Sequence, residues 1–205
     1  MLQKIKSLAQ RRLFSERQDI DTDSAARDLL LQAMPKYAIC AEIGVWEGDF
    51  SQRILDTTQP TKLHLIDPWR YQQDSTYKDS LYGGQIGGSQ AHLDKIYARV
   101  CKRFAPKIAN QQVIVHRGES HTVGEEFEDQ YFDWVYIDGN HLYEYAIRDL
   151  HTYYRKVKVG GFITGDDYAE GGWWQGGVKK AVDEFVSLRL VQEIQIYQKQ
   201  YIVRK

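Results

Sequence analysis

The sequence predicts an α/β fold: a doubly wound sheet of seven strands, mostly parallel, with helices on both faces. The first sign is a strand, a glycine turn, a helix and a second strand within residues 38–67, which together form a βαβ unit. Further apolar runs then alternate with helical spacing as far as residue 187. Finally, two short alternating segments, 190–197 and 200–203, lie close enough in sequence to pair as an antiparallel hairpin. Five parallel strands and this hairpin make seven.

The elements follow one another in a regular order. A helix over 1–17 and a second over 24–34 predict an N-terminal helical extension at 1–35, followed by the main domain at 36–205. Strands are expected at 38–44, 61–67, 113–115, 132–137 and 162–164, and helices at 48–57, 91–104, 142–156 and from about 177 to 187. Residues 69–90 break the pattern with several glycines and predict a mobile lid.

Composition excludes several classes of protein. The 205 residues carry a formal net charge of -1 and no long basic run, which disfavours nucleic acid as a partner. No stretch approaches the roughly 18 apolar residues that span a bilayer, and there is no apolar leader. Cys40 and Cys101 show neither metal-site spacing nor a disulfide pattern. These observations predict a cytoplasmic protein without a membrane span, and they are compatible with a homodimer or a higher homo-oligomer.

The glycine turn after the first strand indicates a cofactor site. In Glu42-x-Gly44-x-x-x-Gly48, backbone can approach a ligand at the start of a helix. Glu47 inside the turn would repel a pyrophosphate, so a cofactor with an amine and a sulfonium suits it better than a dinucleotide. Asp67, which ends the next strand, is placed to accept hydrogen bonds from two ribose hydroxyls. The alternative is a turn glycine and a helix-capping acid without a ligand.

Three acids end the fourth and fifth strands. Asp138 closes one apolar run, and Asp166 and Asp167 close the next. Because the carboxyl ends of neighbouring parallel strands meet at one sheet edge, their oxygens predict a site for a hard divalent cation. The alternative is that one acid caps a helix or binds the cofactor, and that the site holds no metal.

From Ala38 onwards the chain resembles the class I S-adenosylmethionine-dependent methyltransferases, which have a Rossmann-like fold. The segment Ile137-Asp138-Gly139-Asn140-His141-x-Tyr143-Glu144 is similar to a pattern of metal-dependent O-methyltransferases that act on macrolide sugars, such as the macrocin type, and on aminocoumarin sugars. The resemblance implies that S-adenosylmethionine is the cofactor. It assigns the methionine part to Glu42, Gly44, Trp46 and Gly48, the ribose to Asp67, and the adenine edge to Glu119 and Ser120.

The same resemblance implies a metal and a base. The placement of Asp138, Asp166 and Asp167 resembles that of the metal ligands in catechol-type enzymes, and three carboxylates favour magnesium over zinc, with manganese or calcium as alternatives. His141 lies where the catechol-type enzymes keep a general-base lysine, and an imidazole titrates near neutrality. Asp138 is a rival base, and a purely structural His141 is the remaining alternative.

The sequence therefore predicts methyl transfer from S-adenosylmethionine to an oxygen of a small-molecule acceptor with vicinal oxygens, such as a sugar or a catechol. Two alternatives stay open. One is an enzyme of the same fold that resembles cephalosporin hydroxylases, and the other is a cofactor-binding protein without turnover. An Asn-Pro-Pro-aromatic segment is missing after the fourth strand, which argues against methylation of nucleic-acid bases or glutamine.

Overall fold

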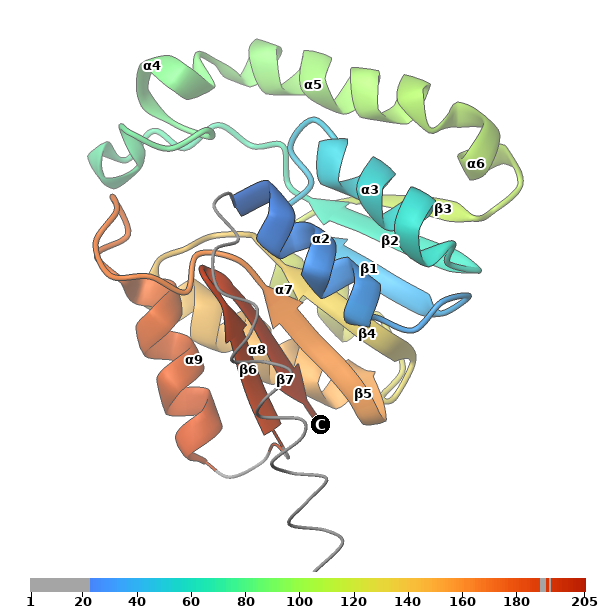
Figure 1. The fold of residues 1–205 in the computed structure, drawn as a ribbon. Coiled ribbons are helices and arrows are strands. Elements are labelled where there is room, and N and C mark those ends of the chain that lie inside the picture. Colours follow the sequence, from blue (N-terminus) through green and yellow to red (C-terminus); the bar gives the residue numbers. More distant parts are fainter. Residues whose placement is uncertain (1–22, 189–190, 192) are drawn as a thin grey trace, which may run out of the picture.

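One seven-stranded sheet organises the computed structural model, which describes residues 23–188, 191 and 193–205 (Figure 1). The expected helix over 1–17 lies outside the described residues. The strands are β1 (Ile39–Ile43), β2 (Lys62–Asp67), β3 (Val113–Arg117), β4 (Phe132–Ile137), β5 (Val157–Gly165), β6 (Glu193–Tyr197) and β7 (Gln200–Arg204). Their order is β3-β2-β1-β4-β5-β7-β6; β1 to β5 pair in parallel, and β7 pairs antiparallel with both β5 and β6. The predicted doubly wound fold with a terminal hairpin is confirmed.

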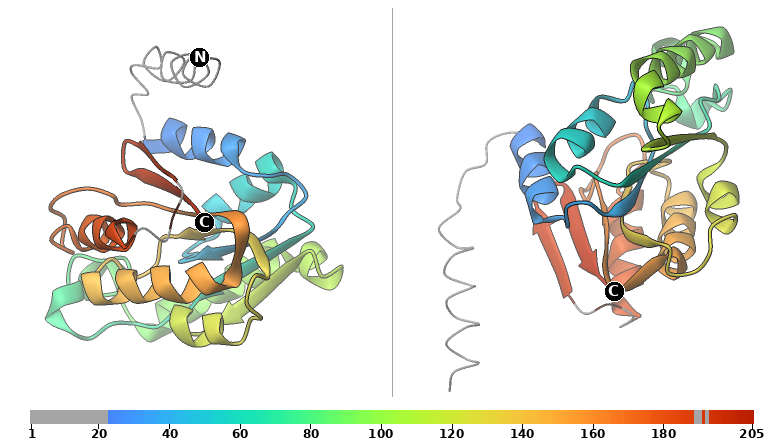
Figure 2. Two further views of the ribbon diagram at one scale, coloured as in Figure 1. Left: turned by 90° about the horizontal axis from the view of Figure 1, so that it is seen from below. Right: turned by 90° about the vertical axis from the view of Figure 1, so that its right-hand side faces the viewer.

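Helices cover both faces of the sheet (Figures 1 and 2). One face carries α2 (Asp23–Ala33), α3 (Asp49–Thr58) and α5 (Gln90–Arg103), and the other carries α7 (Ser120–Glu125), α8 (Tyr143–Lys156) and α9 (Gly177–Ser187). The sequence produces two cores because successive strand side chains point to opposite faces. Cys40 and Trp134 pack into the first core, whereas the next residues along each strand, Ala41 and Val135, pack into the second. Burial on both faces explains why these strands read as continuous apolar runs.

Several short helices and parts of two strands were not predicted. After α5, Pro106 stands in the first turn of α6 (Ala105–Ala109), where a missing backbone N–H costs nothing. Helices α6 and α7 are too short for a helical period to show in the sequence. Strand β5 begins directly after α8 and is longer than the predicted 162–164, because Gly160 adopts a φ of +80° inside the strand instead of ending it.

Residues 69–90, the predicted lid, fold over the carboxyl edge of the sheet as irregular chain with two short helices, η1 (Ser75–Tyr77) and α4 (Gly84–Gly87). Gln90 fixes one end of the segment: its side-chain amide donates to the Trp69 carbonyl at 2.8 Å, and its oxygen accepts from the Tyr71 N–H at 2.9 Å. The mobility of the lid stays a prediction.

Helix α2 belongs to the predicted N-terminal extension, and it packs against α3 and β7. Ala26, Leu30 and Leu31 form its buried face. The domain boundary at residue 35 stays a prediction. In the part of the chain that the structure describes, none of the helices combines the length and the apolar character needed to cross a membrane.

Candidate active site

The carboxyl ends of β1, β2, β4 and β5 meet at one edge of the sheet, and backbone hydrogen bonds fasten the loops that leave them. The Gly44 N–H donates to the Ile66 carbonyl at 2.9 Å, and the Asp138 N–H donates to the Ile43 carbonyl at 2.7 Å. The Asp166 N–H donates to the Ile137 carbonyl at 3.3 Å. The glycine turn and the strand-end acids are thereby neighbours, as the sequence predicts.

Gly44 is the point where two of these loops touch. Its φ is +87°, and a Cβ atom here would lie 1.9 Å from the carbonyl oxygen of Asp138. Both the backbone conformation and the space therefore require glycine. The turn after β1 and the loop after β4 consequently lie in direct contact, which brings the predicted cofactor turn beside the predicted metal edge.

Asp67 is buried at the end of β2, and four protein donors surround its carboxylate. One oxygen accepts from the backbone N–H groups of Val45 and Trp46 at 2.9 and 3.1 Å and also from the Tyr82 hydroxyl. The other accepts from the Trp69 N–H at 2.6 Å. Burial raises the pKa of Asp67, and these hydrogen bonds oppose the rise. A ligand hydroxyl at the first oxygen would have to replace one of its three donors, whereas the second oxygen, with a single donor, can accept another hydrogen bond.

Glu42, in the middle of the predicted cofactor motif, is almost completely buried. Its carboxyl group accepts a hydrogen bond from the Ser51 hydroxyl of α3. Burial raises the pKa of Glu42 well above its usual range, and the bond from Ser51 acts in the opposite direction. A cationic group brought beside Glu42 would favour its charged form, which is the property expected of an acid that binds an amine.

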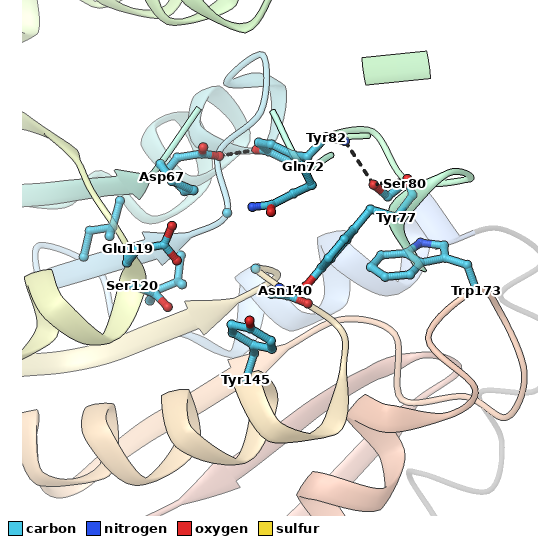
Figure 3. A pocket seen from close by; sticks show the side chains of 15 residues that line it. Asp67, Gln72, Tyr77, Ser80, Tyr82, Glu119, Ser120, Asn140, Tyr145 and Trp173 are labelled. Carbon is cyan, nitrogen blue, oxygen red and sulfur yellow. Dashed lines mark hydrogen bonds between the residues drawn. The ribbon is translucent and has the colours of Figure 1, made fainter. Parts of the chain in front are cut away.

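Two adjoining pockets open at this edge. The Asp67 pocket, drawn in Figure 3, lies between the ends of β1 and β2, the lid, the start of α7 and the loop after β4. The Asp138 pocket lies beside α2, the glycine turn and the start of α3. They share five lining residues, namely Gly44, Ser80, Tyr82, Gly139 and Trp173. One ligand can therefore extend from one pocket into the other.

Six of the seven predicted cofactor residues line these pockets. Asp67, Glu119 and Ser120 line the Asp67 pocket, Glu42 and Trp46 line the Asp138 pocket, and Gly44 lines both. Gly48 lines neither; it precedes α3 with a φ of +79°, and its backbone packs against Phe104. The binding roles of all seven residues stay predictions, but their placement along two connected pockets is what one extended cofactor requires.

At the ends of β4 and β5, Asp138, His141 and Asp167 form one group in which the candidate ligand atoms all lie within 4.8 Å of one another. The His141 Nε2 is hydrogen-bonded to Asp138 Oδ1 at 3.2 Å. Its Nδ1 is 3.1 Å from Asp167 Oδ2 but is not aligned for a hydrogen bond. Asp167 has a φ of +58°, a left-handed conformation that is uncommon outside glycine and that marks the turn leaving β5.

Asp166, the third predicted acid, faces a different partner. Its Oδ2 accepts from Nε of Arg27 at 2.9 Å and also from Nη2 of the same guanidinium. Its Oδ1 accepts from the Asp167 N–H at 2.6 Å. The structure thus brings the three acids to one edge, as predicted, but divides them between a guanidinium and an imidazole.

The charges around His141 change its titration and that of Asp167. Burial opposes protonation of His141, but the hydrogen bond to Asp138 and the negative charges of the neighbouring acids outweigh it and raise its pKa. Burial raises the pKa of Asp167 to about 6, with the charge of His141 acting against the rise.

A divalent cation fits this group of residues. Two carboxylates and one imidazole are ordinary ligands for such an ion, and the His141 Nδ1 is a buried polar atom without a hydrogen bond. With Asp166 engaged by Arg27, the ligand atoms that remain are those of Asp138, His141 and Asp167. Whether Asp166 ligates a metal stays a prediction.

Aromatic residues wall the space beside His141. The His141 ring stacks with Trp173, with ring centres 5.8 Å apart, and Trp173 also contacts Tyr77 of the lid. The Tyr77 hydroxyl accepts a hydrogen bond from the Asn140 amide at 2.8 Å. Trp173 lines both pockets, whereas Trp174 packs against the second core. Trp174 also meets His141 edge to face, with ring centres 5.1 Å apart, so both tryptophans border the imidazole.

Three residues at or beside the site were not predicted from the sequence, namely Arg27, Tyr82 and Asp149. Arg27 stands between the buried positions of an amphipathic helix, and an arginine next to an apolar face is a weak signal that it reaches a buried acid. Tyr82 lies in irregular chain, where no period indicates a direction. Asp149 lies on the buried face of α8, where its carboxylate accepts from the Ser120 hydroxyl at 2.6 Å. A carboxylate at an apolar helical position is the signal that could have identified it.

A family model described as a methyltransferase domain matches residues 41–168, which is more than half of the chain. Over 55 residues, 27% of this chain, the sequence is 40% identical to the uncharacterized protein R132 of Acanthamoeba polyphaga mimivirus. That match spans only 24% of the viral protein, about a quarter of its length.

Solved structures share the fold. The O-methyltransferase NovP superposes with a TM-score of 0.56 at 19% identity, over 88% of this chain and 76% of NovP. SMU.1697c, a putative methyltransferase from Streptococcus mutans in complex with SAH, gives a TM-score of 0.56 at 14% identity, over 89% of this chain and 96% of that one. At these identities the likeness establishes the architecture, and the family match establishes the methyltransferase domain.

Proposed function

The chain belongs to this family of S-adenosylmethionine-dependent methyltransferases, and we propose that it methylates an oxygen of a small molecule with vicinal oxygens, assisted by a divalent cation. The observation that carries the proposal is the junction of the two pockets. The Asp67 pocket holds the predicted ribose and adenine residues, and it shares Gly139 and Trp173 with the pocket that contains Asp138 and His141. A methyl donor in one pocket would therefore lie beside the acid and imidazole in the other.

For the cofactor, the proposal assigns the methionine part to Glu42, Gly44, Trp46 and Gly48, the ribose to Asp67, and the adenine edge to Glu119 and Ser120. Buried Glu42 supports this assignment because a carboxyl group in an apolar setting gains most from an arriving ammonium. Asp67 supports it as well. One ribose hydroxyl can bind Oδ1, which accepts a single hydrogen bond, whereas a second hydroxyl at Oδ2 would displace the Tyr82 hydroxyl, because Oδ2 already accepts three.

For the acceptor, the proposal uses the acidic edge. Asp138 and Asp167, with Asp166 as the third predicted ligand, would hold magnesium or another hard divalent cation, whose chemistry is to lower the pKa of a bound hydroxyl and fix its orientation. Asp138 lines the second pocket, so an acceptor there meets the carboxylate directly. The wall formed by Trp173 and Tyr77 suits a flat aromatic ring or the apolar face of a sugar.

His141 is the proposed general base, and Asp138 remains the alternative. The Nε2 of His141 is 3.2 Å from Asp138 Oδ1, so Asp138 orients the ring and stabilises the imidazolium that forms when His141 takes a proton. Transfer of the methyl group is an in-line displacement, in which positioning and charge stabilisation supply most of the rate.

The test is a methylation screen with isotopically labelled S-adenosylmethionine against diols, catechols and monohydroxylated acceptors, with magnesium or with a chelator. The proposal expects product from vicinal oxygens only, and loss of product in the chelator. Asp138→Asn should abolish the response to magnesium, whereas Asp129→Asn, which removes an exposed acid paired with Lys156, should not. Full activity in the chelator would remove the cation from the mechanism.

His141→Gln separates its two conceivable roles. As a base, His141 contributes to turnover, so the variant should bind Mn²⁺ normally and turn over about 10² to 10⁴ times more slowly. The deficit should shrink at high pH as hydroxide replaces the base. Loss of Mn²⁺ binding would instead make His141 a metal ligand and leave Asp138 as the base.

The screen also decides between the remaining alternatives. A hydroxylase-like enzyme of the same fold would yield a product heavier by one oxygen, and a binding protein would retain cofactor without product. The proposal also places the enzyme in the cytoplasm, acting on a small molecule and not on nucleic acid. The free thiols of Cys40 and Cys101 support that placement.

A further inference from the structure

Arg27 reaches the acidic edge from α2, outside the predicted methyltransferase domain. Its Nε is 2.9 Å from Asp166 Oδ2, and its Nη2 contacts the same oxygen and lies 3.4 Å from Asp138 Oδ2. The guanidinium also lies 5.5 Å from the ring centre of Phe50 on α3. One side chain therefore bridges two of the three strand-end acids and is held in place by an aromatic ring.

The pairing occupies Oδ2, one of the two carboxylate oxygens of Asp166. Its Oδ2 receives two N–H groups of Arg27, with the Tyr136 hydroxyl at 3.5 Å, and its Oδ1 receives the Asp167 N–H. The Asp166 side chain is only 6% exposed. A cation at Oδ2 would have to displace Arg27 and would leave a buried acid without that partner.

The charges at the edge lead to the same conclusion. Asp138, Asp166 and Asp167 carry three negative charges, and Arg27 supplies one positive charge in contact with two of them. A neutral His141, which the proposed base requires, leaves two negative charges in excess on these four groups, and one divalent ion balances them. We propose that Arg27 is a positioning residue that keeps Asp166 in an internal ion pair and matches the edge to a divalent cation. This inference rests on the cation of the proposed function.

The proposal makes a prediction about ion charge. Coulomb attraction grows with the charge of the ion, so removing one fixed positive charge strengthens binding of a trivalent ion more than that of a divalent ion. Tb³⁺ and Mn²⁺ both accept carboxylate oxygens and serve as the two probes. The ratio of the Tb³⁺ affinity to the Mn²⁺ affinity therefore reports the net charge of the strand-end acids and Arg27. Partial unfolding alone would not raise this ratio in favour of Tb³⁺.

Arg53 provides a matched control. It lies on α3, and its guanidinium also lies over the Phe50 ring, 5.8 Å from the ring centre. It pairs with Asp28 on the outer side of α2 instead of with the strand-end acids. Arg53→Met therefore removes an arginine from the same aromatic ring without changing the charge in contact with Asp138 and Asp166.

The experiment titrates the full chain and its variants with Mn²⁺, followed by paramagnetic resonance of the free ion, and with Tb³⁺, followed by luminescence. In Arg27→Met the Tb³⁺-to-Mn²⁺ affinity ratio should rise about tenfold or more. Arg27→Lys keeps the charge and should stay within about twofold of the unchanged protein, as should Arg53→Met. Should Arg27→Met fail to fold, Arg27→Gln, which keeps polar contacts without the charge, is judged by the same criterion.

The outcomes separate the two proposals. If every protein binds Mn²⁺ and Arg27→Met shows the same ratio as Arg53→Met, the role of Arg27 is overturned while the cation stands. If the unchanged protein binds no Mn²⁺, the cation of the proposed function fails, and the inference about Arg27 is overturned with it. A raised ratio in Arg27→Met that Arg27→Lys restores supports both.

Discussion

Asp149 should make the protein less stable as the pH rises. This acid of α8 is only 1% exposed, and its Oδ1 accepts from the Ser120 hydroxyl at 2.6 Å. Its Oδ2 is buried without a hydrogen-bond partner. Burial raises the pKa of Asp149 from an ordinary 3.8 to about 7, while the bond from Ser120 and the charge of Arg148 act against the rise. Replacing it by asparagine removes the titration and keeps the shape.

The sign and size follow from proton binding. Between pH 4 and 7 the folded protein keeps a proton on Asp149 that the unfolded chain has already lost, so stability falls as pH rises through this window. Each pH unit costs about 1.4 kcal/mol, which gives an upper bound of about 4 kcal/mol. Below pH 4 both states are protonated and the contribution of Asp149 is constant. Asp149→Asn should therefore gain stability over the unchanged protein progressively from pH 4 to 7.

Urea unfolding of both proteins at intervals from pH 4 to 8 measures this difference, since other titrating groups are common to both. Asp183→Asn is the control, because Asp183 is exposed and its pKa is lowered: partial burial acts against the lowering, but hydrogen bonds from Lys179 and Tyr168 outweigh it. That control should show a small change of opposite sign. Parallel curves for Asp149→Asn and the unchanged protein would refute the reasoning and show that water reaches the Asp149 carboxylate.

Two further predictions concern the cofactor edge. Tyr82→Phe should bind S-adenosylhomocysteine more tightly by calorimetry, by a few fold, because it removes the hydroxyl that competes for Asp67; weaker binding would mean that this hydroxyl contacts the cofactor. Gly44→Ala should destabilise the fold by more than about 3 kcal/mol in thermal unfolding, because the added carbon would overlap the Asp138 carbonyl. Gly171→Ala, which has a φ of +80° but open space, should cost only about 1 kcal/mol. Equal costs would show that strain in φ, and not the close approach, requires glycine at residue 44.

The sheet was predictable because its signal is local and repeated. Each central strand is an apolar run whose side chains alternate between two cores, and a helix of ordinary length follows most of them. Helices α6 and α7 were not predicted because five or six residues are too few to show a helical period. The contact between Tyr82 of the lid and Asp67 was not predicted for a related reason. In irregular backbone, the sequence has no periodicity from which the direction of a side chain can be inferred.

The sequence predicts where the candidate site lies, but not which protein groups pair with its acids. The rule that ligands lie at the carboxyl ends of parallel strands correctly placed Asp138, Asp166 and Asp167 at one edge. The rule does not predict that Arg27 pairs with Asp166, because the two residues are 139 positions apart and meet only when α2 docks on the sheet. The local sequence does not say which acid such an arginine reaches.

The buried acids of the edge differ in what a ligand can gain from them. Asp67 and Asp166 each already accept several hydrogen bonds from protein groups, so a ligand there mainly exchanges one donor for another, and the net gain of such an exchange is about 1 kcal/mol. Asp138 and Asp167 keep 23% and 17% of their side chains exposed and share one imidazole. An arriving cation therefore gains most at these two carboxylates, and this is why a change of charge there should alter metal binding more than any change at the buried acids.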